Sequence, residues 1–415
     1  GYYFMLGPIY RWSRHHLGFL GAINLLRILN LVFAAMGLGW LLLALKPFCS
    51  GSRLGYLAAL TTSLFPMFLV FTCRVSNNAL SMFIIGMVFY LLSQIGTCRR
   101  LSVQCLLLGL LLGAGTWIRV DIMPFYLAAT AVLLWQAQSR QLPWRHALGS
   151  IVVVLGVAAI VSWSQYSWNL RHYSTLFPSQ EMFRIESGAS VSWTAALAVR
   201  LIGDVLLQRL LVLNLWTSGW SFLFLPVAVY AVYGLFLAAI GISLGWFLLR
   251  HFKGRAFPEQ TLTIACMLVF GFVCAGAVMH ALLSVLANAG IISTPSYYAT
   301  PGFIPVLCLG LYSLQRLSRH LSVTVLIGLL VLFILAEWAG IFLIGVPYWT
   351  QTISFAEAFC RLQVIHPAFP SPQWLPLLLF LFGAVGVAIG RIILRMGWAR
   401  EEAESSAGKH RVDSF

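Results

Sequence analysis

One cation lies close to two amide side chains in a short segment between two apolar runs. Arg74 is followed by Asn77 and Asn78, which puts one cation and two amides at the mouth of two predicted membrane spans. A cation flanked by amide donors suits a phosphate group, because each N–H can donate to a phosphate oxygen. The alternative is a charged loop in which Asn77 caps the helix that follows.

A second joint carries charges of both signs. Arg119 and Asp121 are separated by one residue and border an apolar run, so both must lie near the boundary of the hydrocarbon. Charges at that depth are costly and are candidates for function by default. The alternative is an Arg/Asp pair that caps two helix ends.

Two further regions carry polar residues with a possible function. The longest predicted outer segment opens with Arg171 and His172, and from about Val191 to Leu213 its pattern becomes helical and amphipathic. That pattern fits a helix in the outer interface, either functional or an ordinary anchor. Glu337 is the only acid well inside a predicted span; it is either a functional carboxylate or a protonated side chain bonded to a neighbouring helix.

Other kinds of chemistry find no support in the residue pattern. The sequence has no phosphate-binding P-loop and no HExxH motif, so we expect no nucleotide hydrolysis by this chain. The eight cysteines are scattered, without a CxxC pair or a Cys/His cluster, and predict neither a disulfide framework nor a metal site. No resident cofactor is indicated, although a divalent cation is compatible with phosphate chemistry.

The elements that must position these residues are membrane helices. Hydrophobic residues make up 60% of the chain and charged residues only 9%, with a mean hydropathy of +0.89, against roughly 25% charged residues in a soluble domain. About 20 apolar residues cross the hydrocarbon as a helix. The fold class we predict is all-α, a polytopic helical bundle of about eleven transmembrane helices. The predicted spans are Ile23–Leu45, Leu54–Cys73, Asn77–Ile95, Leu101–Ile118, Met123–Gln136, Ala147–Trp168, Trp220–Leu249, Leu262–Ala287, Pro301–Leu314, Val323–Val346 and Trp374–Leu394.

Alternate joints differ in their content of Lys and Arg, which favour the cytoplasmic side. Every joint of one set is basic, whereas the joints around Arg74 and Arg119 belong to a set that is poorer in charge per residue. We therefore predict that the second set lies on the outer face, with the C-terminus in the cytoplasm. The basic set holds Lys46, Arg53, Arg99, Arg100, Arg140, Arg145, Arg250, Lys253, Arg255, Arg316, Arg319, Arg395 and Arg400.

One membrane domain, residues 1–396, accounts for nearly the whole chain. It includes the outer loop 169–219 with its amphipathic helix, and a charged, polar tail at 397–415 is expected to be disordered in the cytoplasm. The net charge of +15 does not predict nucleic-acid binding, because the basic residues sit in short joints and form no stripe. Membrane lipids are the expected surroundings.

The joints and their order resemble the polyprenyl-phosphate-dependent glycosyltransferases of the GT-C fold, the group that contains protein O-mannosyltransferases and the aminoarabinose transferase of lipid A. Residues 74–80 are similar to a family joint in which the position of Asn78 is usually Asp. Arg119 and Asp121 match an Arg-x-acid joint after a Gly-rich span. Residues 169–173 are similar to the start of the family's large outer loop, and Tyr298 to Pro301 resemble a Tyr- and Pro-containing stretch, with Tyr297 in place of an Arg.

This resemblance implies sugar transfer from a polyprenyl-phosphate donor to a lipid, glycan or protein acceptor at the outer, periplasmic face of the plasma (inner) membrane. Arg74 and Arg119 would hold the donor phosphate, with Asn77 and Asn78 as supporting donors. The family's catalytic base is an acid in the first outer loop, which is expected to precede Gly1. Asp121 is the best remaining acid near the phosphate site. Further outer-loop candidates are Arg171, His172, Tyr297 and Tyr298.

Two other functions remain open. A transporter or flippase of a lipid-linked sugar would also need a polytopic bundle, but such proteins commonly carry inverted repeats and broken helices at midplane, and the sequence shows no convincing repeat. An inactive family member with a structural role is compatible with the departures at Asn78 and Tyr297.

Overall fold

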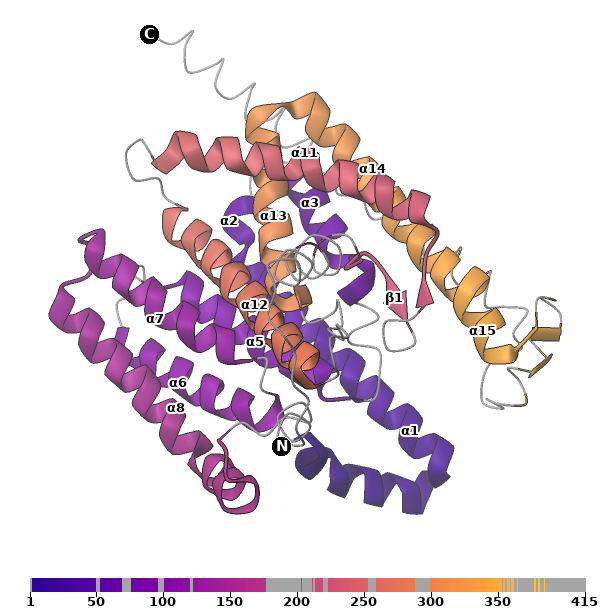
Figure 1. Ribbon diagram of the computed structural model, residues 1–415, viewed down its shortest axis with the longest axis horizontal. Helices are drawn as coiled ribbons and strands as arrows, with labels where there is room; N and C mark the ends of the chain where they lie inside the picture. The colour runs from indigo at the N-terminus through magenta and orange to yellow at the C-terminus, as the bar shows by residue number, and fades with distance from the viewer. Residues whose placement is uncertain are drawn as a thin grey trace, which may run out of the picture.

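The computed structural model describes residues 2–49, 53–68, 76–95, 101–119, 122–176, 213–218, 223–252, 259–287, 299–352 and a few single positions outside these ranges. Long helices dominate this part of the chain (Figure 1). The elements are α1 (Tyr2–Ala44), α2 (Lys46–Cys49), α3 (Arg53–Ser63), α5 (Asn78–Ser93), α6 (Leu101–Ile118), α7 (Met123–Gln138), α8 (Trp144–Tyr173), β1 (Thr217–Ser218), β2 (Leu223–Phe224), α11 (Val227–Phe252), α12 (Gln260–Ala287), α13 (Thr300–Leu317), α14 (Arg319–Ala339), the π-helix η4 (Gly340–Gly345) and α15 (Val346–Thr350).

Six helical stretches of the described chain are long and apolar enough to cross a membrane. Less than half of the most apolar window of each stretch is buried, and large apolar side chains such as Ile160, Leu235 and Ile242 point outward, as helices facing lipid require. The predicted all-α polytopic membrane bundle is therefore confirmed. The six stretches are Leu6–Ala44, Leu101–Ile118, Trp144–Tyr173, Val227–Arg250, Gln260–Val285 and Arg319–Thr350.

Every predicted span except Trp374–Leu394, which lies mostly outside the described residues, overlaps a described helix. One prediction is wrong: the span Leu54–Cys73 is not one continuous helix, because α3 ends at Ser63 and the chain turns before Pro66. Proline lacks an N–H and disfavours helical backbone in the residue before it. An antiparallel pair of two-residue strands, β1 and β2, is a small addition to the helical fold.

The first helix is longer than its predicted span, because it begins at Tyr2 and not near Ile23. Its 43 residues would extend about 65 Å if straight, about twice the thickness of the hydrocarbon. At Gly18 the backbone leaves helical geometry, with φ 70° and ψ 180°, a conformation that glycine adopts at little cost. The helix therefore bends into an arm, residues 2–17, and a long limb, residues 19–44 (Figure 1).

Small residues let helices approach closely at the centre of the bundle. Gly86 of α5 faces Gly37 of α1, so a Cβ on Gly86 would overlap the Gly37 carbonyl. Gly109 and Gly113 of α6 face the backbone of α8 in the same way. Backbone contact of this kind stabilises helix pairs in lipid, where dispersion replaces the hydrophobic effect.

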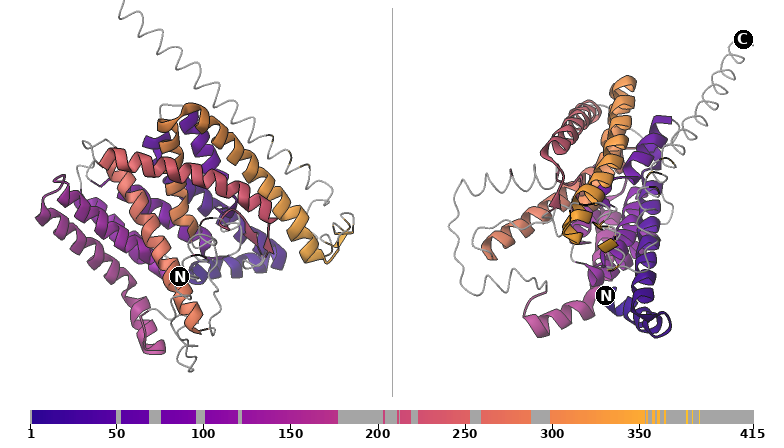
Figure 2. Two further views of the ribbon diagram at one scale, coloured as in Figure 1. Left: turned by 45° about the horizontal axis from the view of Figure 1, so that its top comes forward. Right: turned by 90° about the vertical axis from the view of Figure 1, so that its right-hand side faces the viewer.

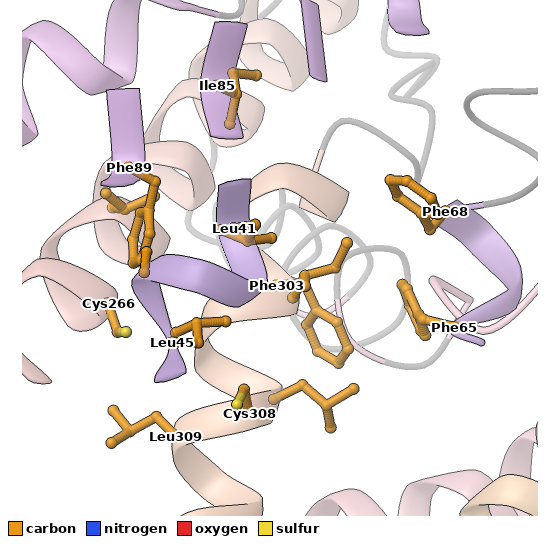
Figure 3. Close-up of a cluster of buried hydrophobic side chains, with 14 of the residues drawn as sticks. Leu41, Leu45, Phe65, Phe68, Ile85, Phe89, Cys266, Phe303, Cys308 and Leu309 are labelled. Carbon is orange, nitrogen blue, oxygen red and sulfur yellow. The ribbon is translucent and has the colours of Figure 1, made fainter. Parts of the chain in front are cut away.

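Apolar side chains from distant segments meet beneath these contacts (Figure 3). Leu41 of α1 and Leu45, which follows that helix, lie among Phe89 of α5 and Phe303 and Cys308 of α13. Helix α12 packs against both α7 and α13 and so connects the first half of the chain to the second. The two halves share one continuous core, which holds the helix ends in fixed relation to one another.

Candidate functional site

The start of α5 and the end of α6 meet through the side chain of Asn77. Its Nδ2 donates to the carbonyl of Ile118 at 3.0 Å, and Nη1 of Arg119 donates to its Oδ1 at 3.4 Å. Asn77 occupies the capping position of α5, yet its side chain makes no capping hydrogen bond. The structure thus brings together two residues, Asn77 and Arg119, that the sequence places in separate joints.

Local backbone geometry explains this arrangement. The last carbonyls of a helix have no partner within the helix, and the Asn77 amide satisfies that of Ile118. Arg119 continues the turn, with its N–H on the Gly115 carbonyl at 2.9 Å. From the other side, the buried Asn30 of α1 donates to the Ser76 carbonyl at 3.4 Å. Three helices are therefore fixed at one point.

The electrostatic character of this junction is positive. The first turn of a helix presents backbone N–H groups and the positive end of the helix dipole. In α5 the Ser76 hydroxyl accepts from the Asn78 N–H at 3.4 Å, whereas the Asn77 side chain accepts from none of these groups. Arg119, which is half-buried, adds a full charge. The chain contains no acidic residue before Asp121. An anion is the ligand that such a junction can hold.

The other predicted residues of the two joints have different outcomes. Asn78 begins α5 and is 7% exposed, so its side chain is packed within the bundle. Arg74 and Asp121 lie outside the described residues, as do Tyr297 and Tyr298. Their assignment to the site stays a prediction.

A polar cluster next to the junction was not predicted from the sequence. Thr116 of α6 and Tyr126 of α7 share a hydrogen bond of 2.8 Å, and the indole of Trp117 donates to the Val161 carbonyl of α8 at 2.9 Å. These bonds fix the end of α6, and with it Arg119, against α7 and α8. Thr, Trp and Tyr near helix ends are common in membrane proteins, which is why no sequence signal distinguished them.

Arg171 and His172 lie at the far end of α8 and are not part of the junction. Arg171 is about 15 Å further along the helix than Val161, whose carbonyl meets Trp117. Both side chains are exposed. The His172 ring stacks on Trp168, with ring centroids 4.3 Å apart, and its Nδ1 lies 2.9 Å from the Trp168 carbonyl. The predicted interfacial helix Val191–Leu213 falls almost entirely outside the described residues.

Glu337 belongs to a second polar cluster, in the other half of the chain. Its Oε1 and the indole nitrogen of Trp216 are buried, and neither has a hydrogen-bond partner among the described residues. The Trp216 ring lies directly on Gly340, one turn beyond Glu337. The Tyr230 hydroxyl donates to the Trp216 carbonyl, and Thr300 donates to Asn214 Oδ1 at 3.3 Å. The cluster ties the segment around Asn214 and Trp216 to α11, α13 and α14.

Metal-binding groups do not gather in the part of the chain that the structure describes, where no three His, Cys, Asp or Glu side chains could hold one ion. The junction of Asn77 and Arg119 is the candidate site, because it brings a cation to the first turn of a helix.

Comparison with known proteins gives one result. Residues 20–163 match the family model described as dolichyl-phosphate-mannose-protein mannosyltransferase. The match runs from the limb of α1 to the middle of α8 and includes Ser76, Asn77 and Arg119. No curated protein and no solved structure matches the chain. Over residues 20–163 the chain is thus similar to the dolichyl-phosphate-mannose-protein mannosyltransferases, which supports a membrane glycosyltransferase of the GT-C class.

Proposed function

We propose that the protein transfers a sugar from a polyprenyl-phosphate donor to a lipid, glycan or protein acceptor. The observation that carries this proposal is the start of α5, whose first turn the Asn77 side chain does not cap, beside Arg119, which is hydrogen-bonded to Asn77. The family match, whose name specifies a dolichyl-phosphate-mannose donor, supports a sugar linked to a lipid phosphate. We further propose that Arg74 and Asn78 complete the phosphate site.

The chemical step requires stabilisation of negative charge on the leaving phosphate. As the acceptor hydroxyl attacks the anomeric carbon, the carbon–oxygen bond to phosphate breaks and its electrons pass to the polyprenyl phosphate. Arg119 and the first N–H groups of α5 are fixed where they can stabilise that charge without rearrangement. A base takes the hydroxyl proton. We assign Asp121 the role of ion partner to Arg119, which keeps the guanidinium oriented.

The site is proposed to face the outer, periplasmic side of the plasma membrane. The start of α5, the end of α6 and the start of α7 lie on the same side of the bundle, because hydrogen bonds join them there. The opposite helix ends carry Arg140 and Arg145 around the α7–α8 turn, and Arg316 and Arg319 around the α13–α14 turn. Lys and Arg mark the cytoplasmic side of a membrane protein, so the junction belongs to the other side.

The test is donor turnover by single variants in liposomes. Dolichyl-phosphate and undecaprenyl-phosphate mannose, radiolabelled in the sugar, are supplied with cell membranes as a source of acceptor. Arg74→Ala and Arg119→Ala are each expected to abolish release of the sugar from the lipid. Arg316→Ala is the matched control, because this exposed arginine lies over the Tyr312 ring at the other end of the bundle.

Normal turnover in both Arg74→Ala and Arg119→Ala would overturn the phosphate site. Movement of intact donor across the liposome membrane, with no release of sugar by the unmodified protein, would identify a transporter instead. Turnover lost in the Arg316→Ala control as well would show that the assay reports folding alone.

A further inference from the structure

Two helices extend well past the candidate site on the same side of the bundle. The limb of α1 reaches the level of the junction at Asn30, which contacts Ser76, and α8 reaches it at Val161, which contacts Trp117. Gly18 and Tyr173 lie about twelve residues, or about 18 Å, beyond these contacts along their helices. Figure 1 and the right-hand view of Figure 2 show both helix ends at the lower edge of the molecule, and in Figure 1 the arm of α1 runs along that edge.

The same group of side chains occurs on both projecting ends. In the arm of α1, His16 packs against Trp12 with ring centroids 4.9 Å apart, and its Nδ1 lies 2.8 Å from the Trp12 carbonyl. At the end of α8, His172 and Trp168 repeat this geometry. In each pair Nδ1 is used within the helix, so the ring's other nitrogen faces away from the helix backbone. An exposed arginine accompanies each pair, Arg14 in the arm and Arg171 in α8.

Within α1 and α8 the two ends carry positive charge and no acid. The arm exposes Arg11 and Arg14 together with His15 and His16, and neither α1 nor α8 contains an acidic residue. Outer-face segments are normally poor in arginine, because Lys and Arg orient the chain from the cytoplasmic side. Orientation therefore does not account for arginines on the side assigned to the outer face.

Exposed apolar side chains accompany the cations. Trp12 is 57% exposed and Trp168 is 48% exposed. Leu17 and Phe19 flank the bend of α1, and Leu170 lies beside Arg171, all of them exposed. Tryptophan with leucine and cations at the end of a membrane helix is the composition that settles at the headgroup level of a bilayer. An acidic protein or a nucleic acid would complement the charge but not these apolar groups.

We propose that two segments bind anionic phospholipid headgroups on the side of the bilayer that carries the junction. They are residues 6–17, within the arm of α1, and residues 168–173 at the end of α8. The arginines pair with the phosphates, the tryptophans enter the headgroup region, and the leucines reach the acyl boundary. This surface would keep the two projecting helices seated in the same leaflet, on either side of the site. Each arginine near an anionic surface favours binding by about fivefold.

The test is photolabelling of the protein in nanodiscs of phosphatidylcholine. Each sample contains a trace of photoactivatable phosphatidylglycerol or of photoactivatable phosphatidylcholine, and mass spectrometry locates the labelled peptides. Phosphatidylglycerol is expected to label residues 2–20 and 163–176 more strongly than phosphatidylcholine. The variant Arg11→Gln/Arg14→Gln/Arg171→Gln should lower that preference by about fivefold for each arginine removed from an end.

A matched control removes cations from the opposite end of the bundle. Arg140→Gln/Arg145→Gln changes two exposed arginines there and should leave the labelling of both projecting ends unchanged. If the triple variant does not fold, the unmodified protein still tests the proposal, because the preference for phosphatidylglycerol must weaken as salt is raised.

Equal labelling by the two lipids would overturn the proposal, as would a preference that salt does not change. Displacement of phosphatidylglycerol from the two ends by a soluble acidic peptide or a short DNA would overturn it in favour of a soluble partner. Labelling requires no sugar transfer, so the inference can fail while the proposed enzymatic function stands, and the reverse.

Discussion

Two polar clusters near helix ends differ in charge and in accessibility. At the first, Arg119 is half-buried and is hydrogen-bonded to Asn77 at the start of α5. At the second, Oε1 of Glu337 is buried, and the Trp216 ring packs on Gly340 one turn further along the chain. The first cluster therefore carries a partly exposed cation, whereas the acid of the second is enclosed by the protein's own side chains.

This difference teaches that a polar residue in a membrane span is not by its presence a binding site. Glu337 is the stronger candidate by the usual rule, since carboxylates inside the membrane are rare and functional. Its surroundings are those of a structural joint, because Trp216, Tyr230 and Thr300 connect four segments there. Arg119 is less unusual in its position, but its contact with Asn77 at the start of α5 is what we propose as the phosphate site.

The largest expected effect separates the two clusters by activity. Arg119→Ala should lower donor turnover by about 10²–10³-fold, the loss typical of one donor to a developing oxyanion. Glu337→Gln, which preserves the shape of the side chain, should leave turnover near that of the unmodified protein. Radiolabelled donor in liposomes provides the measurement. A loss of activity in Glu337→Gln as large as in Arg119→Ala would erase the distinction.

The next effect is on stability and belongs to the second cluster. Gly340→Ala introduces a Cβ that overlaps the Trp216 ring. The ring must therefore move, which should lower the free energy of unfolding by about 1–3 kcal/mol. Thermal unfolding in detergent, followed by tryptophan fluorescence, should show a lower midpoint. Gly241→Ala is the control, because a Cβ there meets nothing within 4 Å. An unchanged midpoint for Gly340→Ala would mean that Trp216 is not held against η4.

The smallest effect refines the description of the first cluster. Asn77→Ala removes the acceptor for Arg119 and leaves the Ile118 carbonyl without its partner. Because a hydrogen bond to a charged group contributes about 1.5–3 kcal/mol, turnover should fall by about tenfold or somewhat more. The fall should appear in kcat, since Arg119 remains present but loses one of the side chains that orient it. Asn77→Gln, with the same amide on a longer stem, should recover part of the activity.

Much of the bundle could be predicted because apolar run length alone determines a membrane helix. Helix α6 has the bounds predicted for its span, Leu101–Ile118. The break before Pro66 and the early start of α1 were missed. At Pro66 the apolar run continues although the helix ends, and in the arm of α1 the helix continues although Arg11 and Arg14 interrupt the apolar run, so hydropathy registers neither boundary.

The candidate site was predictable only in part. Membrane topology placed the Arg74 and Arg119 joints at the same face, which is why Asn77 and Arg119 could be expected near each other. The partner of Asn77 could not be predicted, because a capping asparagine and one that bonds to a neighbouring helix have the same local sequence. Trp216 and Glu337 are far apart in the chain, and nothing in either segment specifies their contact.

The limb of α1 between the bend at Gly18 and the contact of Asn30 with Ser76 is unbroken helix. Its length therefore determines where the arm lies relative to the junction. One residue inserted there would rotate the arm by about 100° about the helix axis and turn its arginines away from their present direction. Seven inserted residues, nearly two full turns, would restore the direction but raise the arm by about 10 Å. The length of this one apolar stretch therefore sets both the direction and the height of the arm.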